Sequence, residues 1–192
     1  MDLLVLGTLL MSTSWLMFAA PAAQAEAGPA PLAGARGQVA SDVTVKAGLL
    51  FNFAKFAVWP TLPAATPIAL CAVDTEAIAS VLDDTVRGVT ITGHPIEVRR
   101  PANSASWRGC HVLFLTDTTS RPAADGLQVI RTQPVLTVSD AKGFAQAGGI
   151  IELYIQDNRM RFTINLDALD RAGLRLSSRL LDLAKTIRDA RE

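Results

Sequence analysis

Three aspartates follow short apolar runs of the sequence, a position where acidic side chains can do chemistry. Asp74, Asp117 and Asp140 each come just after such a run, and Lys142 follows the third. If the runs are parallel strands, their carboxyl ends meet at one edge of a sheet, which makes the three carboxylates a candidate ligand pocket. An acidic cluster with a nearby lysine also resembles the phosphoacceptor site of a receiver domain.

Other features of the sequence weigh against a catalytic or metal site. The first run lacks a neighbouring pair of acids, and aspartate after a strand is more often a helix cap or turn residue. Two cysteines and two separated histidines do not make a metal ligand set. The Gly-rich phosphate loops and the nucleophile motif G-x-S-x-G do not occur. We therefore expect a protein that is not an enzyme and has no catalytic residue, metal or cofactor.

The sequence contains the residue types of a serine-hydrolase triad, but their positions do not favour one. Ser139, Asp140 and His111 have suitable side chains, but His111 opens an apolar run that reads as a core strand. A structural histidine is the better interpretation. Lys plus Arg and Asp plus Glu each number 18, so no net charge points to nucleic acid.

The N-terminus indicates export. The stretch from Leu3 to Ala20 is almost wholly apolar, and Ala23-Gln24-Ala25 is a small-x-small cleavage site. We expect residues 1–25 to be a signal peptide cleaved after Ala25, which places the protein in the periplasm without direct membrane insertion. An uncleaved anchor is the alternative. Residues 26–41 are expected to be a flexible lead and residues 42–192 a single domain.

Export also makes the two cysteines interpretable. The sequence contains two cysteines, Cys71 and Cys110. An even number of cysteines in an oxidising compartment favours a disulfide over two buried free thiols.

The first helix of the domain carries apolar residues all round. Lys46 to Trp59 reads as a helix that Pro60 ends, with Val45, Leu49, Phe53 and Phe56 on its inner face. The opposite face carries the candidate interface, which consists of Phe51, Lys55, Val58 and Trp59. A surface helix that is apolar on both faces must be covered on both. Either a later segment of this chain covers the second face, or another protein does.

Strands and helices alternate along the rest of the domain. Apolar runs at residues 68–73, 111–116 and 135–138 are expected strands, with helices at about 75–85 and 120–131 between them. A hairpin is expected over residues 89–100, and an antiparallel pair at residues 150–155 and 160–164. Helices at residues 166–172 and 177–188 close the chain. The pattern predicts a single α/β domain with a mostly parallel sheet, an antiparallel edge pair and helices on both faces.

These runs together resemble the YfiR family of small periplasmic proteins, over about residues 43–187. The matching pieces, in order, are Lys46 to Pro60, Gly93, Pro95-Ile96, Val98, Gly109 to Phe114, Val138 to Asp140, Phe144, Gly149-Ile150, Arg161-Phe162, Ile164-Asn165, Gly173-Leu174, Ser177-Ser178, Leu180-Leu181 and Leu183-Ala184.

The resemblance implies a regulatory role exercised through protein contact. It implies a homodimer whose partner is the periplasmic domain of a membrane-anchored diguanylate cyclase, which it holds inactive, lowering cyclic di-GMP and biofilm formation. Cys71 and Cys110 fit a disulfide of the family. Some relatives carry a second cysteine pair near residues 144–155, where this chain has Ala145 and Glu152. A periplasmic small-ligand-binding protein, with its pocket at Asp74, Asp117 and Asp140, is the alternative function.

Overall fold

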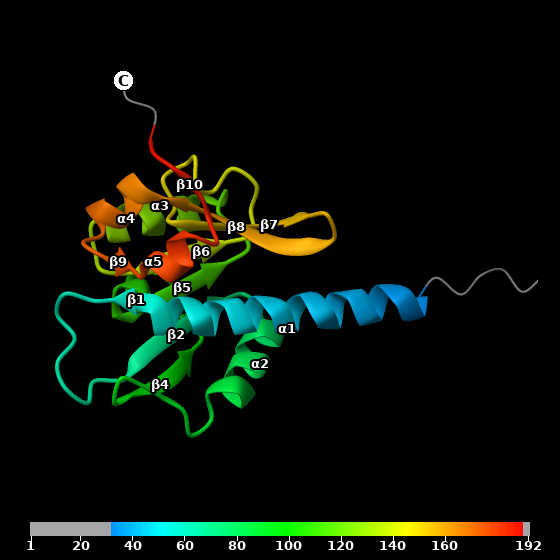
Figure 1. Cartoon of the computed structure of the whole chain (residues 1–192), viewed down its shortest axis with the longest axis horizontal. Coiled ribbons are helices and arrows are strands. Elements are labelled where there is room, and N and C mark those ends of the chain that lie inside the picture. The colour runs from blue at the N-terminus through cyan, green and yellow to red at the C-terminus, as the bar shows by residue number, and fades with distance from the viewer. Residues whose placement is uncertain (1–31, 190–192) are drawn as a thin grey trace, which may run out of the picture.

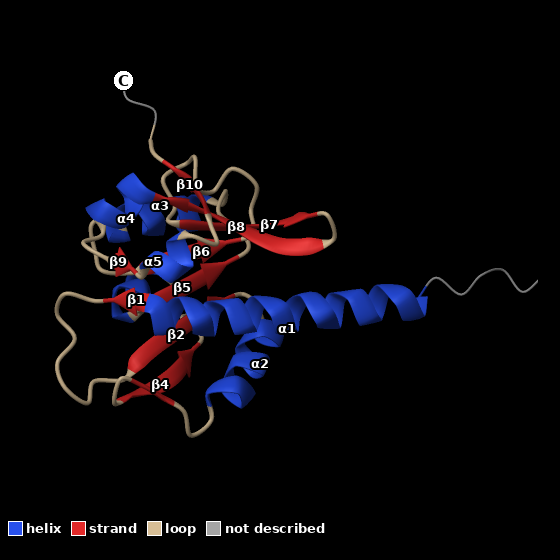
Figure 2. Ribbon diagram, viewed as in Figure 1, coloured by secondary structure: helices blue, strands red, loops and turns tan. Residues whose placement is uncertain are grey.

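The computed structural model describes residues 32–189, with only the backbone described for residues 32–40 and for Pro122. Sixteen elements follow one another along these residues: α1 (Leu32–Phe56), β1 (Ala57–Val58), β2 (Ile68–Val73), α2 (Glu76–Val86), β3 (Thr90–Ile91), β4 (His94–Arg99), the 3-10 helix η1 (Ser104–Gly109), β5 (Val112–Leu115), α3 (Arg121–Ile130), β6 (Leu136–Ser139), β7 (Ile151–Gln156), β8 (Arg159–Asn165), α4 (Leu166–Arg171), β9 (Arg175–Leu176), α5 (Ser178–Leu181) and β10 (Lys185–Ile187). Figures 1 and 2 show their arrangement. The predicted signal peptide lies outside the described residues.

The centre of the molecule is an eight-stranded sheet in the order β10-β8-β7-β6-β5-β2-β4-β3. Neighbouring strands are parallel except for the pairs β3–β4 and β7–β8, which are antiparallel. The predicted α/β class with a mostly parallel sheet is therefore confirmed. The pair β7–β8 does not end the sheet, because β10 adds a parallel strand outside β8.

Helices cover both faces of the sheet, and alternate residues of each strand enter two cores. In β2, Ile68 and Leu70 join the larger core with α1 and α2, whereas Ala69 and Cys71 join a second core. That second core contains Trp107 of η1 and Ile130 of α3. Side chains of a strand point alternately to its two faces, so both sides of these apolar strands are buried.

The first helix is longer at one end and shorter at the other than the sequence predicted. It begins at Leu32, inside the expected flexible lead, because the stretch after Pro31 is proline-free and contains good helix formers. It ends at Phe56, because Ala57 and Val58 pair antiparallel with Leu176 and Arg175 of β9. The prediction that Val58 and Trp59 are helical was wrong.

The C-terminal segment also differs from the prediction. Only Ser178–Leu181 of the expected helix over residues 177–188 is helical. Lys185 and Thr186 pair instead with Thr163 and Ile164 of β8. The unpaired edge of β8 offers backbone hydrogen-bond partners to residues 185–187. The apolar pattern within residues 177–188 carries no information about this distant edge, so it could not predict the strand.

Candidate functional site

The three aspartates of the candidate pocket lie at the carboxyl ends of β2, β5 and β6, but they do not share one cavity. Asp74 and Asp117 line a cavity of about 120 Å³ next to Trp107. Asp140 lines a different cavity beside α1. The expected meeting of all three carboxylates is therefore corrected.

Asp117 shapes the turn that leads into α3. Its Oδ1 accepts hydrogen bonds from the backbone N–H of Thr119 at 2.9 Å and of Ser120 at 3.1 Å. Hydrogen bonds from Ser120 and Thr119 lower the pKa of Asp117 to about 2, because they stabilise the charged form. These donors are side-chain hydroxyls and backbone N–H groups of an exposed turn at a helix start, which is the ordinary turn role of aspartate.

Asp140 forms an ion pair with the first helix. Its Oδ2 lies 2.7 Å from Nζ of Lys46, and the two side chains are 25% and 17% exposed. The pair joins α1 to the end of β6. The carboxylate is thus already paired with a residue of this chain, and it lines a different cavity from Asp74 and Asp117.

One of the four residues of the candidate interface, Trp59, is buried in the structure. Trp59 is only 8% exposed and belongs to the larger core, because the chain turns out of the helix before it. Its ring packs edge-on against His111, with centroids 5.4 Å apart. Phe51 is half-buried against the same core. Trp59 is therefore removed from the candidate interface.

Two members of that interface remain on the surface. Val58 is 59% exposed, and Lys55 is exposed with its Nζ 6.0 Å from the ring centroid of Phe56. Both residues line a hollow of about 420 Å³ that also includes His94 and Ser177. The side chains of Lys55 and Val58 are the part of the predicted interface that a partner can reach.

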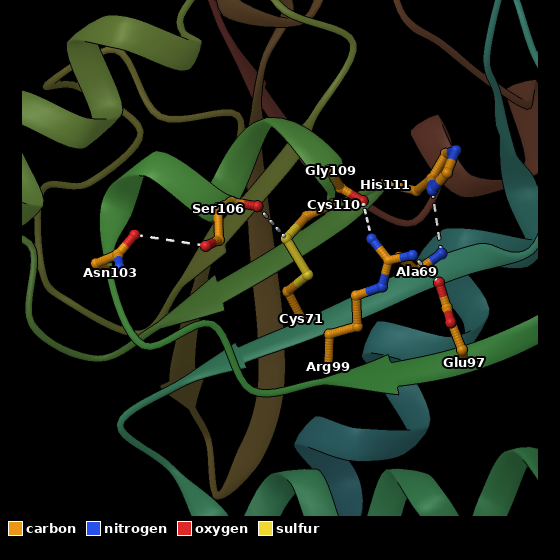
Figure 3. The surroundings of a disulfide bond; sticks show 9 residues. All are labelled: Ala69, Cys71, Glu97, Arg99, Asn103, Ser106, Gly109, Cys110 and His111. Atoms are coloured by element: carbon orange, nitrogen blue, oxygen red, sulfur yellow. Dashed lines mark hydrogen bonds and ion pairs between the residues drawn. A yellow bond between two sulfur atoms is a disulfide. The ribbon is translucent and has the colours of Figure 1, made fainter.

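Cys71 and Cys110 form a disulfide, as the sequence predicted, with their Cα atoms 5.8 Å apart. Figure 3 shows the bridge between β2 and the residues that lead into β5. Beside it, Nη1 of Arg99 donates to the carbonyl of Gly109 at 2.8 Å, and Arg99 also pairs with Glu97. The bridge therefore ties together strands that the sheet has already placed side by side.

His111 holds the backbone next to this bridge. Its Nδ1 accepts a hydrogen bond from the backbone N–H of Ala69 at 3.0 Å, as Figure 3 shows. Burial lowers the pKa of His111, and the positive charge of Arg99 lowers it further. A neutral ring that accepts from the backbone is structural, in agreement with the interpretation of this histidine from the sequence.

Glu152 has a role that the sequence analysis did not identify. It is 7% exposed, and its two carboxylate oxygens accept from the backbone N–H groups of Gly143 and Ala145, each at 3.0 Å. The side chain thus clamps the loop between β6 and β7. Its signal in the sequence was a charged residue inside the apolar run Ile150 to Leu153, since buried carboxylates require internal partners.

Asn165, which the sequence analysis also missed, connects three segments. It is fully buried, and its Oδ1 caps α4 by accepting from the backbone N–H of Ala168 at 3.0 Å. Its Nδ2 donates to the carbonyl of Ala145 and to Asp189, each at 2.7 Å. The same loop is therefore held from two strands, by Glu152 of β7 and Asn165 of β8.

The described residues contain neither a cluster of metal-ligating side chains nor a helix that could span a membrane. Residues 32–189 contain no group of three or more His, Cys, Asp or Glu side chains placed to hold a metal ion. Within the same part of the chain, no helix is both long and apolar enough to cross a bilayer.

The structure is a small α/β domain in which the polar residues described above make structural hydrogen bonds and ion pairs. The family model described as YfiR/HmsC-like matches residues 43–185, and the chain belongs to this family. The family predicted from the sequence is thereby confirmed. Its members are periplasmic regulatory proteins.

Two solved structures are also similar to this chain. A conserved domain protein from Vibrio cholerae O1 biovar El Tor is 16% identical with a TM-score of 0.46, over 75% of this chain and 59% of that one. An ABC domain in complex with L-Trp from Streptococcus pneumonia is 10% identical with a TM-score of 0.40, over 63% of this chain and 54% of that one. The match thus spans less than two thirds of each solved chain.

Proposed function

We propose that this protein binds the periplasmic domain of a membrane-anchored diguanylate cyclase and holds the enzyme inactive, which lowers cyclic di-GMP and biofilm formation. The observation that carries the proposal is the match of the YfiR/HmsC-like family model to residues 43–185. A regulator of this kind must bind the inactive arrangement of the cyclase more tightly than the active one, because only a difference in affinity shifts the equilibrium.

The junction between α1 and β1 is the contact surface that we propose for the cyclase. Val58 is 59% exposed there, next to the exposed Lys55. An apolar side chain beside a cation, above a hollow of about 420 Å³, offers both an anchor and a charge to a partner.

Recovery of the cyclase with the exported protein tests this proposal. The full-length chain with a C-terminal tag is expressed in its own cells, the membranes are solubilised, and proteins bound to the tag are identified. We expect a membrane protein with a periplasmic domain and a cytoplasmic diguanylate cyclase domain, and a loss of it in Val58→Glu. Val129→Glu is the matched control, because Val129 is 48% exposed on α3. Absence of any cyclase from the wild-type sample contradicts the proposal.

Export and dimerisation belong to the same proposal. We expect the mature protein to begin at Glu26 in the periplasmic fraction, and mass spectrometry of the purified protein checks this. The homodimer that the family implies is checked by light scattering during size exclusion. An intact N-terminus in the membrane fraction contradicts cleavage, and a monomer at micromolar concentration contradicts the dimer.

Binding of a small ligand is the second candidate function. It is supported by Asp74 and Asp117, which line one cavity, although its volume of about 120 Å³ is small for a ligand pocket. A thermal-shift screen with periplasmic metabolites separates this function from the first, because a true ligand raises the melting temperature with the logarithm of its concentration.

A further inference from the structure

A cavity next to α3 is separate from the surfaces described above. Figure 1 shows α3 and α4 at the same end of the molecule. Residues of both helices, of β6 and of the loop between β6 and β7 line a cavity of about 190 Å³. We call it the α3 cavity. It shares no lining residue with the cavity at Asp74 and Asp117 or with the hollow at Val58.

The wall of the α3 cavity is mostly apolar. Leu127 and Ile130 come from α3, and Phe144 and Ile150 come from the loop between β6 and β7. All four are buried except Leu127, which is half-buried. A cavity of about 150 Å³ lined by Leu, Ile and Phe side chains is large enough to bind benzene. The α3 cavity therefore has room for one aromatic ring or a branched apolar chain of similar size.

The one charged side chain among the described residues that line this cavity is Arg131, at the carboxyl end of α3. Arg131 is exposed and takes part in no ion pair within residues 41–189. None of the described lining residues is acidic. An anionic group that enters the cavity would thus meet a cation and no carboxylate.

A second guanidinium, that of Arg171, lies beside the same cavity. A Cβ atom on the lining residue Gly148 would lie 3.6 Å from Nη2 of Arg171 and 3.8 Å from Nη2 of Arg131. Within residues 41–189, Asp189 is the only carboxylate that pairs with either cation, through Nη1 of Arg171, and the charge of Arg131 also acts on it. Nε and Nη2 of Arg171 are buried without a hydrogen-bond partner among these residues. Two cations therefore share one carboxylate at this wall.

A buried hydroxyl offers a further donor. Thr137 of β6 lines the cavity and is 7% exposed. Its Oγ1 accepts a hydrogen bond from the backbone N–H of Ile150 at 3.1 Å, and its hydroxyl hydrogen has no acceptor among the described residues. A hydroxyl can accept and donate at the same time, so Thr137 can donate to an oxygen of a ligand. Gln128, which is exposed and also lines the cavity, can donate through its amide.

We propose that the α3 cavity binds a small carboxylate whose body is one aromatic ring or a branched apolar chain. The body fills the apolar part of the cavity, and the carboxylate forms charge-assisted hydrogen bonds with Arg131. Arg171 contributes its charge without touching the ligand, because its free nitrogens are buried. Amino acids fit less well, since their ammonium group would find no carboxylate among the described lining residues.

Titration of the purified protein, followed through its backbone amide NMR signals, tests this site. The probes are phenylacetate, phenylacetamide without the charge, phenylglycine with an added ammonium group, and acetate without the ring. We expect phenylacetate to shift the signals of Gly148, Gly149 and Ile150 saturably, and to bind at least about tenfold more tightly than each other probe. No saturable shift at these amides, or equal binding of any other probe, overturns the proposal.

Three variants test the assigned contacts. Arg131→Gln removes the charge at an exposed position, so phenylacetate should bind about tenfold less tightly. Arg121→Gln is the matched control and should bind as wild type does, because Arg121 lies on the same helix, is 92% exposed and does not line the cavity. Ala124→Leu places extra bulk on the wall without removing Arg131, and it should also weaken binding. Wild-type affinity in Arg131→Gln or Ala124→Leu, or a matching loss in Arg121→Gln, overturns the proposal.

This inference goes beyond the proposed function and does not rest on it. Val58→Glu tests the surface that we assign to the cyclase, and Arg131→Gln tests the α3 cavity. If the cyclase is recovered but phenylacetate does not bind, only the α3 cavity is wrong. If phenylacetate binds as described but no cyclase is recovered, the α3 cavity stands and the proposed function is wrong.

Discussion

Nζ of Lys46 lies 2.7 Å from Oδ2 of Asp140, and this ion pair fastens the first helix to the carboxyl end of a central strand. Both groups are largely buried, at 17% and 25% exposure. Because the pair takes up the carboxylate, the strand end that looked like part of a ligand pocket is instead an attachment point for α1.

Removal of one partner should destabilise the protein. Lys46→Met leaves a largely buried carboxylate without its cation, so we expect a loss of about 1–3 kcal/mol in the free energy of unfolding. Urea denaturation checks this. The double variant Lys46→Met/Asp140→Leu should recover part of the loss, because an apolar pair needs no compensation. Equal stability of Lys46→Met and wild type would contradict the role of the pair.

The disulfide should contribute strongly to stability. Reduction of the Cys71–Cys110 bridge, whose cysteines are 39 residues apart in sequence, frees a long loop of the unfolded chain. We expect the double variant Cys71→Ala/Cys110→Ala to lose about 3–4 kcal/mol in the free energy of unfolding. Denaturation of wild type with and without reductant gives the same comparison, and the reductant should have no effect on the variant.

Local patterns of the sequence were enough to predict the central strands. The runs at residues 68–73 and 135–138 are apolar except for Thr137 because both of their faces are buried, and the structure places them in the middle of the sheet. The expected antiparallel pair is also present as β7 and β8, and the positive φ angles of Asp157 and Asn158 form the tight turn between these two strands.

Long-range pairing could not be predicted in the same way. The strand at Ala57–Val58 exists because Leu176 and Arg175 lie beside it, and the strand at Lys185–Ile187 because the edge of β8 is open. For the same reason the burial of Trp59 was missed: the helix ends three residues before it, and helical periodicity no longer applies.

The clamp made by Glu152 should protect two specific backbone amides. Glu152→Ala leaves the buried N–H group of Ala145 and the partly buried N–H group of Gly143 without acceptors, at a cost of about 1–3 kcal/mol for the buried one and less for the other. Hydrogen exchange at these two residues should therefore accelerate. Glu152→Gln keeps one acceptor oxygen, so we expect an intermediate effect. Unchanged exchange at both amides in Glu152→Ala would exclude the clamp.

Acid should destabilise the protein through His111. Burial, followed by the charge of Arg99, lowers the pKa of this histidine below its ordinary value of 6.5, so the unfolded chain binds the proton more readily than the folded one. Its contribution to stability is thus complete above about pH 6.5 and declines as the pH falls below that value. The melting temperature of wild type should drop between about pH 7 and about pH 5, and His111→Asn should reduce that drop. An identical pH dependence in the two proteins would rule out this residue as the cause.

The central claim is that this protein restrains a diguanylate cyclase from the periplasm, and the cellular concentration of cyclic di-GMP tests it most directly. Cells that lack the protein are compared with cells that carry wild type, Val58→Glu or Val129→Glu at equal abundance. We predict that cyclic di-GMP rises when the protein is absent, returns to normal with wild type and Val129→Glu, and stays high with Val58→Glu. An unchanged concentration in cells that lack the protein would contradict the claim.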